Sequence, residues 1–289
     1  MNLIGILALP LLLTAAFVTG VVAWILTAYA RFRWWHWRAG LQALPLTGVA
    51  LLRYIARETW AVAAIVAYRP LALRELPPPA QRKGGVVLFV HGFTQDATNW
   101  RRMRAALHQL GRPTVAVTLG RPFQPLDGYV PALVTALRAQ AANGPVDIVA
   151  HSMGGLILRM ALRDNPELRG GVRRVVTLGS PHAGTGSADG VPLFPDVRAM
   201  RRGSDALVRL PDLATLVPHA PVTTVAAHHD LVVYPSSTSH LTGARCVDLP
   251  GIGHTGLLVH DEVIAIVTEA LQRAHVVMAE PFADPCAAA

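Results

Sequence analysis

The segment Ala150-His151-Ser152-Met153-Gly154-Gly155 decides the fold of this chain. A short apolar run typical of a buried strand precedes it, and a helical pattern follows it. A serine at so tight a strand-to-helix turn needs small residues two positions before and after it, here Ala150 and Gly154. The turn raises Ser152 Oγ above the sheet and next to helix N–H groups that favour negative charge. The segment therefore predicts a nucleophilic serine; the alternative is an ordinary turn with Ser152 as a helix cap.

A serine hydroxyl is a weak nucleophile unless a base removes its proton and a third group orients the base. Asp230 follows an apolar, strand-like run, at the edge where parallel sheets collect functional groups. His254 lies in a glycine-rich loop before the last helical pattern. In folds where a nucleophilic serine stands at a strand-to-helix turn, the acid and then the histidine follow it along the chain, as Asp230 and His254 do here. We therefore predict a catalytic triad of Ser152, Asp230 and His254.

Other acids and histidines lie in less suitable contexts. Asp248 lies within a strand-like run, whereas Asp189 and Asp196 belong to a long insertion. Several further histidines lie beside the acid or lack a strand end before them, namely His228, His229, His240 and His260. We interpret all of these as polar residues without a catalytic role.

An apolar, glycine-led strand at residues 84–90 precedes His91-Gly92-Phe93-Thr94. Ester hydrolysis passes through a tetrahedral oxyanion, and a backbone N–H aimed at it contributes roughly 3–4 kcal/mol. In folds with such a serine turn, one donor is the N–H of the residue after the nucleophile, here Met153. The other donor lies in the loop after an earlier strand. We expect this second donor to be the N–H of Phe93, because Gly92 lets the backbone come close.

Together with Thr177-Leu178-Gly179-Ser180-Pro181-His182-Ala183-Gly184-Thr185, these segments resemble the α/β-hydrolases of the bacterial lipase and esterase group, over about residues 84–275. The resemblance implies a carboxylic ester hydrolase that uses the predicted triad. Some lipases of this group bind calcium through an aspartate two places after the catalytic histidine. Gly256 stands at that place, so we expect no metal site, and we expect no cofactor.

Alternating strand-like and helical patterns predict an α/β fold with a doubly wound, mostly parallel sheet, the α/β-hydrolase fold. The expected strands are 86–90, 114–118, 146–150, 172–178, 223–227 and 245–249. The expected helices are 99–110, 129–142, 153–164 and 261–274. The alternation breaks at 184–221, where we expect a lid insertion with an apolar and basic helix at 197–210. The alternative is an ordinary surface helix.

Residues 2–30 contain no charged side chain. A helix over residues 3–29 would be about 40 Å long, more than the roughly 30 Å of a bilayer hydrocarbon core. Aromatic residues near its C-terminal end fit an interfacial belt, namely Trp24, Tyr29, Trp34, Trp35 and Trp37. The chain start lacks the basic region and short apolar core of a cleaved signal peptide. We therefore predict an N-terminal transmembrane helix, a single-pass anchor with a basic and aromatic flank, at residues 1–38.

A second apolar segment, 39–75, has charged residues in its middle that would each cost roughly 3 kcal/mol at a bilayer centre, namely Arg53, Arg57 and Glu58. Arg53 and Arg57 share a helical face, which favours an amphipathic interfacial helix. The positive-inside rule favours a cytoplasmic catalytic domain on a bacterial-type inner membrane, because three arginines follow the span: Arg31, Arg33 and Arg38. If the second segment crossed the bilayer, the domain would lie on the other side.

The remaining chain divides into a proline-rich linker at 76–83, the hydrolase domain at 84–275 and a loose tail at 276–289. The formal net charge is +8, and the basic residues are all arginine except Lys83. No nucleic-acid motif accompanies this charge, so no nucleic-acid partner is expected. On a membrane-anchored protein, positive charge favours contact with anionic lipid.

These observations predict a membrane-anchored serine hydrolase of carboxylic esters that works through an acyl-enzyme. The expected substrates are lipids or small esters, with lipase, esterase or phospholipase A activity. An acyltransferase would use the same triad, with an alcohol in place of water. A non-catalytic membrane scaffold with a hydrolase fold is the alternative from another class, and an intact triad argues against it.

Overall fold

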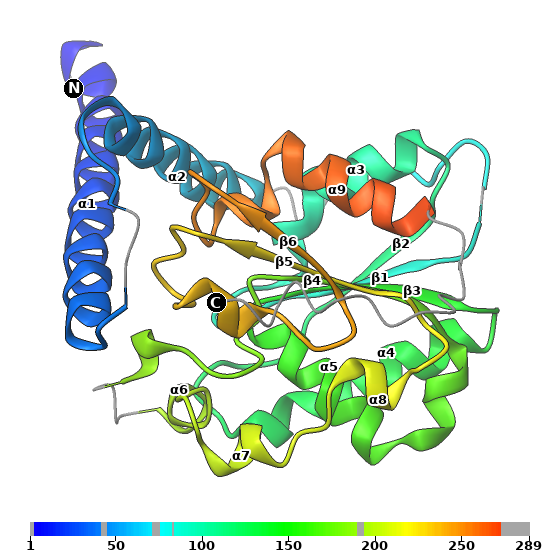
Figure 1. Cartoon of the computed structure of the whole chain (residues 1–289). Helices are drawn as coiled ribbons and strands as arrows, with labels where there is room; N and C mark the ends of the chain where they lie inside the picture. The colour runs from blue at the N-terminus through cyan, green and yellow to red at the C-terminus, as the bar shows by residue number, and fades with distance from the viewer. Residues whose placement is uncertain (1–2, 42–44, 71–75, 83, 190–193, 273–289) are drawn as a thin grey trace.

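A computed structural model describes residues 3–41, 45–70, 76–82, 84–189 and 194–272, with side chains from residue 12 onward (Figure 1). Its centre is a parallel sheet with the strand order β2-β1-β3-β4-β5-β6. The strands are β1 (Val87–Val90), β2 (Thr114–Val117), β3 (Val146–His151), β4 (Val172–Leu178), β5 (Val222–Ala227) and β6 (Arg245–Leu249). Each agrees with its expected strand to within one residue at either end, so the predicted parallel α/β fold is confirmed.

The longer helices of the domain also lie where the sequence pattern predicts them. They are α3 (Arg101–Gln109), α4 (Val130–Ala141), α5 (Met153–Asp164) and α9 (Asp261–Gln272). The last two residues of the expected helix 261–274 lie outside the described residues. Helices α4 and α5 cover one face of the sheet, and α3 and α9 cover the other (Figure 1).

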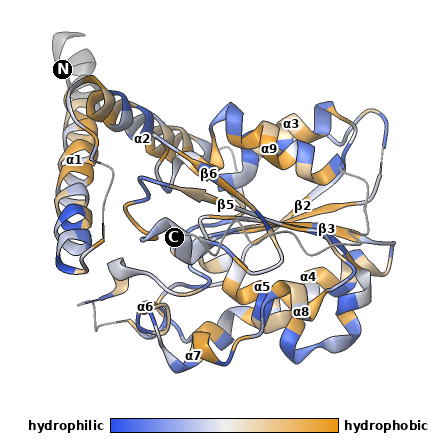
Figure 2. Ribbon diagram, in the orientation of Figure 1, coloured by the Kyte–Doolittle hydropathy of each residue, from blue (hydrophilic) through white to orange (hydrophobic). Residues whose placement is uncertain are grey.

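Neighbouring strand residues supply two separate hydrophobic cores. Leu88 and Val90 of β1 pack in the core with α4 and α5, whereas Val87 and Phe89 pack in the core with α3 and α9. Successive side chains of a strand point to opposite faces, so a strand that is covered on both faces reads as a continuous apolar run. The hydrophobic colouring of the sheet in Figure 2 follows from this arrangement.

The insertion at 184–221 differs from the expected single helix at 197–210. It forms the short helices α6 (Pro195–Ala199), α7 (Asp205–Val208) and α8 (Leu213–Leu216). Gly203, between α6 and α7, has a φ of +70°, a left-handed conformation that ends a helix and that glycine adopts without strain. Met200 and Leu207 are buried in the core shared with α4 and α5, so the apolar side of this segment packs inward. The prediction of one continuous lid helix is therefore wrong.

Helix α1 (Leu3–Arg38) is longer than the predicted span, and it is long and apolar enough to cross a membrane. Residues 12–20 are exposed. Further along, Ile25 and Phe32 are buried in a cluster with Leu231 and Tyr234, which lie in the loop after β5. The C-terminal third of α1 is therefore packed on the hydrolase domain.

Because the C-terminal part of α1 is packed, some residues of the expected aromatic belt are buried and others are exposed. Trp35 is buried against Tyr234, and Tyr29 is buried where its hydroxyl bonds the backbone of Leu46, whereas Trp24, Trp34 and Trp37 are exposed. Figure 2 shows that the apolar part of α1 gives way to hydrophilic residues toward its C-terminal end. The expected belt is therefore exposed only at Trp24, Trp34 and Trp37.

Helix α2 (Gly48–Tyr68) occupies the segment expected to lie at the membrane interface, and it runs from α1 toward the sheet (Figure 1). One side of it is buried at helical spacing, at Tyr54, Glu58, Ala61 and Ile65. Ala61 and Ile65 belong to the same core as β1 and α9. Helix α2 thus packs on the α/β domain on one side, while its other side exposes Val49, Leu52 and Trp60.

Candidate active site

Ser152 lies at the sharp turn between β3 and α5, with φ 54° and ψ −130°. A positive φ is strained for a residue with a Cβ atom and is typical of functional sites. Small neighbours make the turn sterically feasible: a Cβ atom on Gly154 would lie 2.6 Å from the carbonyl oxygens of Val90 and His91. A Cβ atom on Gly92 would lie 2.7 Å from Ser152 Cβ. The glycines on both sides of the turn therefore allow the serine to stand where the sequence motif predicts it.

Asp230 and His254 form a hydrogen-bonded pair at the carboxyl edge of the sheet. His254 Nδ1 lies 2.7 Å from Asp230 Oδ2. The other carboxylate oxygen, Oδ1, accepts hydrogen bonds from the amides of Val232 and Val233, each at 2.7 Å. Because an ionised carboxylate only accepts, Nδ1 is the donor, and Nε2 of the imidazole is left as a base.

The pair lies next to the serine turn. Gly179, which follows β4, has φ +53°, and a Cβ atom on it would lie 3.2 Å from Asp230 Oδ2 and 3.3 Å from His254 Nδ1. The amide of Ser152 donates to the carbonyl of Leu178, one residue before that glycine, at 2.9 Å. Ser152, Asp230 and His254 are 6%, 2% and 9% exposed. The structure thus brings the three predicted residues to one nearly buried place at the ends of β3, β5 and β6.

His151 is a site residue that the sequence analysis did not single out. Its ring lies 4.5 Å from the His254 ring, centroid to centroid, and its Nε2 lies 3.1 Å from the His254 carbonyl. Its Nδ1 faces Gln95 Oε1 at 3.0 Å. Burial lowers the pKa of His151 well below its ordinary value, so the neutral ring donates to only one of these two oxygens. The residue before the nucleophile thus packs against the residue proposed as its base.

The loop after β1 contains His91, Gly92 and Phe93, the residue expected to donate to the oxyanion. His91 Nε2 accepts from the amide of Leu119 at 2.9 Å, so its Nδ1 donates to the carbonyl of Gly92 at 2.8 Å. The Gly92 amide is used by Gln95 Oε1, at 2.9 Å. In the described part of the chain, the amides of Phe93 and Met153 donate to no protein acceptor. These two N–H groups have no protein acceptor among the described residues, and their role as oxyanion donors stays a prediction.

The rejected acids are each engaged elsewhere. Asp248 lies beside His240, at 3.1 Å, and beside His228, at 3.4 Å. Asp189 accepts a hydrogen bond from the indole of Trp35 at 3.0 Å. Asp196, in α6 of the insertion, is fully buried and accepts a hydrogen bond from the hydroxyl of Tyr129 at 2.8 Å. Their contacts agree with the choice of Asp230 as the acid.

Gly256 stands where calcium-binding relatives of the proposed lipase group carry an aspartate. A Cβ atom on it would lie 2.5 Å from Oε1 of Glu58, so the carboxylate of α2 occupies the space of a side chain at that position. Among the described residues, no group of three His, Cys, Asp or Glu side chains is arranged to hold a metal ion. The absence of a metal and of a cofactor stays a prediction.

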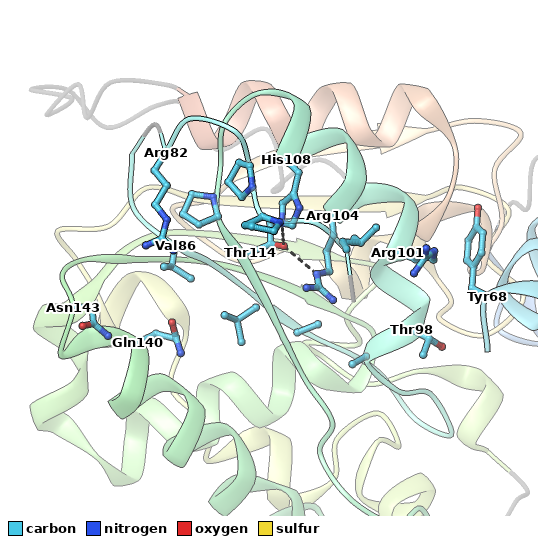
Figure 3. A pocket seen from close by; sticks show the side chains of 17 residues that line it. Tyr68, Arg82, Val86, Thr98, Arg101, Arg104, His108, Thr114, Gln140 and Asn143 are labelled. Carbon is cyan, nitrogen blue, oxygen red and sulfur yellow. Dashed lines mark hydrogen bonds between the residues drawn. The ribbon is translucent and has the colours of Figure 1, made fainter. Parts of the chain in front are cut away.

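A separate hollow of about 810 Å³ lies along the β2 edge of the sheet (Figure 3). Thr114 accepts hydrogen bonds there from Arg104, and it also lies 2.6 Å from His108 Nε2. None of the three candidate catalytic residues lines this hollow. The hollow is therefore not part of the candidate active site.

A parallel, doubly wound sheet that carries a strained serine after β3 and an acid–histidine pair at the same edge defines an α/β-hydrolase. Residues 87–280, more than half of the chain, match the alpha/beta hydrolase family. The chain belongs to this family.

Solved structures with the same fold include three enzymes. Lipase B of Aspergillus fumigatus has a TM-score of 0.57 at 16% identity, over 68% of this chain and 56% of that one. The mature lipase BlEst2 of Bacillus licheniformis has a TM-score of 0.55 at 20% identity, over 68% of this chain and 94% of that one. The metagenomic carboxyl esterase MGS0156 has a TM-score of 0.52 at 15% identity, over 70% and 80%.

The chain thus spans about half of the length of the Aspergillus enzyme and nearly all of the mature Bacillus one. At these identities the likeness concerns the fold. No curated protein matches this sequence.

Proposed function

We propose that this protein is a serine hydrolase of carboxylic esters that is anchored in a membrane by α1. The observation that carries the proposal is the Asp230–His254 hydrogen bond of 2.7 Å beside the strained turn at Ser152. A base oriented by a buried acid, next to a serine whose backbone is strained, is the arrangement that nucleophilic catalysis requires. The lipase and carboxyl esterase names of the similar structures agree with this proposal.

The reaction follows from the positions of these groups. Ser152 Oγ attacks the ester carbonyl while His254 Nε2 takes its proton, and Asp230 stabilises the imidazolium that forms. The N–H groups of Phe93 and Met153 bind the oxyanion of the tetrahedral intermediate. Collapse of this intermediate expels the alcohol, which His254 protonates. Water, activated by the same histidine, then attacks the acyl-enzyme and releases the acid.

A row of aromatic side chains leads away from the proposed oxyanion site. The rings of Phe93 and Phe123 lie 5.5 Å apart, and those of Phe123 and Phe194 lie 4.4 Å apart, centroid to centroid. Phe123 is 49% exposed. An exposed apolar row of this kind suits the acyl chain of a lipid ester, because burial of each methylene contributes about 0.8 kcal/mol.

The anchor supports a lipid substrate. The part of α1 before its contact with the hydrolase domain, up to Trp24, has about 22 residues and a length of about 33 Å, which matches the hydrocarbon core. The exposed side of α2, with Leu52 and Trp60, then lies near the bilayer surface. By the positive-inside rule, the arginines after the span favour a cytoplasmic catalytic domain on an inner membrane.

Fluorophosphonate labelling of the detergent-solubilised full chain, followed by hydrolysis of p-nitrophenyl esters of increasing acyl length, tests the proposal. The wild type should be labelled at Ser152 and should hydrolyse the esters. The Ser152→Ala variant should lose both properties, by several orders of magnitude in rate, while it keeps its melting temperature. A wild type that is neither labelled nor active would favour the non-catalytic scaffold.

A further inference from the structure

Glu58 of α2 is buried, at 3% exposure, on the side of this helix that otherwise buries Tyr54, Ala61 and Ile65. Its Oε1 accepts hydrogen bonds from the amides of Gly253 and Gly256, each at 3.0 Å. Its Oε2 accepts from the amide of Thr255, at 3.2 Å. All three donors lie within two residues of His254.

We propose that Glu58 is a positioning residue for His254. Helix α2, which follows the proposed membrane anchor, would then hold the loop that carries this histidine. The inference rests on the proposed function, because it assigns His254 the role of base. Glu58 does not touch the reacting atoms; it acts through the backbone of the loop. Three N–H groups that converge on one carboxylate form charge-assisted hydrogen bonds, which are about twice as strong as neutral ones.

The glycines around His254 are shaped for this contact. A Cβ atom on Gly253 would lie 2.5 Å from Cδ of Glu58, and one on Gly256 would lie 2.5 Å from its Oε1. Side chains at either position would push the carboxylate away from the amides. The glycine-rich loop therefore serves the approach of Glu58.

Removal of the carboxylate would leave buried donors without an acceptor. Unsatisfied buried N–H groups are unfavourable, so the loop would shift until water or other groups reached them. Such a shift would move the imidazole of His254 relative to Ser152 and Asp230. A displacement of about 1 Å in a catalytic group is enough to lower a rate about 100-fold.

Helix α2 also contacts the loop after β5, which carries Asp230. The hydroxyl of Tyr54, one turn before Glu58, donates to the carbonyl of His229 at 2.7 Å, next to Asp230. Tyr54 belongs to the cluster formed by Phe32 of α1 and by Tyr234. Helix α2 therefore contacts the loops of both Asp230 and His254, and α1 contacts the loop of Asp230 through Tyr234.

Each element that packs against Glu58 brings a charged or titratable group near its carboxylate. Asp230 and His254 face it from the acid and base loops, Tyr54 precedes it on α2, and His260 approaches from beyond Gly256. Burial raises the pKa of Glu58 to about 7, with a smaller rise from the charge of Asp230, while the amides of Gly253 and Gly256 and the charge of His254 oppose this rise. The protonated carboxyl has a hydroxyl in place of one acceptor oxygen, so the ionised form is the one that holds all three amides.

The Glu58→Gln variant in the detergent-solubilised full chain tests the proposal, with a short-chain p-nitrophenyl ester as substrate. Its amide nitrogen replaces one acceptor oxygen at nearly constant volume. We expect kcat and the labelling rate of Ser152 to fall about 10- to 100-fold, with little change in KM and with an altered acid limb of the pH profile. The matched control is Arg57→Gln on the same helix, whose exposed guanidinium pairs with Glu262 and which should behave as wild type.

Active-site titration separates positioning from folding. If Glu58→Gln has the wild-type kcat per titrated site and the wild-type pH profile, the proposal is overturned, whatever its melting temperature. Hydrogen exchange of the wild type provides a test that needs no variant: the amides of residues 253, 255 and 256 should exchange as slowly as those of β3. Fast exchange there would also overturn the proposal. Labelling and ester hydrolysis by the wild type and by Ser152→Ala test the proposed function separately, so its failure is distinguishable from a failure of the Glu58 proposal.

Discussion

The indole of Trp35 donates a hydrogen bond to the carboxylate of Asp189, at 3.0 Å, and so joins α1 to the insertion over the active-site edge. Gly186 makes room for this contact, since a Cβ atom on it would lie 2.3 Å from Cε2 of Trp35. The guanidinium of Arg202 lies over the same indole, at 5.3 Å from the ring centroid. The helix that carries the proposed anchor is therefore fastened to the catalytic domain by specific side-chain contacts.

Truncation should separate the two parts of α1. Deletion of residues 1–20, which include the exposed stretch 12–20, should leave hydrolysis of soluble short-chain esters near wild type, while hydrolysis of vesicle phospholipid falls sharply. Deletion of residues 1–40 also removes Phe32 and Trp35, which pack on Tyr234, so it should lower both activities and the melting temperature. Equal soluble-ester rates for the two truncated proteins would contradict the role assigned to these contacts.

Substitution of the acid tests its assignment. Asp230→Asn should lower kcat by about 10⁴-fold, because the amide favours the wrong tautomer of the histidine. Asp248→Asn is the matched control, since Asp248 contacts His228 and His240 at a partly exposed edge, and it should keep near-normal activity. Steady-state kinetics of both variants on one ester check the assignment. A dead Asp248→Asn beside an active Asp230→Asn would show that the wrong acid was chosen.

Chelation tests the predicted absence of a metal. Because Glu58 occupies the space beside Gly256, treatment with EDTA should change neither the ester hydrolysis rate nor the melting temperature. The measurement is made before and after dialysis against chelator, with calcium added back as the control. An activity loss that calcium restores would reveal a metal site.

The aromatic row predicts a change in chain-length preference. Phe123→Ala removes the central ring between Phe93 and Phe194, so kcat/KM should fall about 10-fold for long acyl chains and about 2-fold or less for acetate esters. Exposed Val208, in α7, is a control site, and Val208→Ala should leave the profile unchanged. A uniform fall over all chain lengths would exclude an acyl-binding role for this row.

Glu58 should make stability and activity respond to pH in opposite directions. Its folded-state pKa, about 7, lies above the ordinary value of 4.5, so between these pH values the folded state holds more protons than the unfolded state. Its contribution to the free energy of unfolding therefore falls as pH rises through this window, by on the order of 3 kcal/mol. Activity should rise as the folded-state carboxyl ionises around pH 7. Thermal unfolding of the wild type and of Glu58→Gln at pH 5 to 8 checks this, and a constant difference between their melting temperatures would contradict it.

Local patterns were sufficient to predict the sheet and the turn that carries Ser152. The strands are buried on both faces, so each reads as an apolar run, and the turn at Ser152 demands small residues at fixed distances along the chain. The insertion was harder to predict. Its apolar and basic spacing resembles one helix, but Gly203 adopts a left-handed conformation and the apolar residues turn into the core. Spacing alone does not distinguish one helix from two short ones that share a buried side.

The sequence by itself determined the parallel α/β fold, the candidate triad residues and the apolar character of the first helix, because each is recognised from a short motif or pattern of neighbouring residues. Only the tertiary structure showed which residues of the α/β domain α1 and α2 contact. Glu58 meets Gly253 across 195 positions, and Trp35 meets Asp189 across 154. In the sequence, the charge of Glu58 among apolar residues favoured a helix at the membrane surface. Only packing places its carboxylate among three loop amides, since the partners of a buried charge are set by the fold and not by its neighbours in sequence.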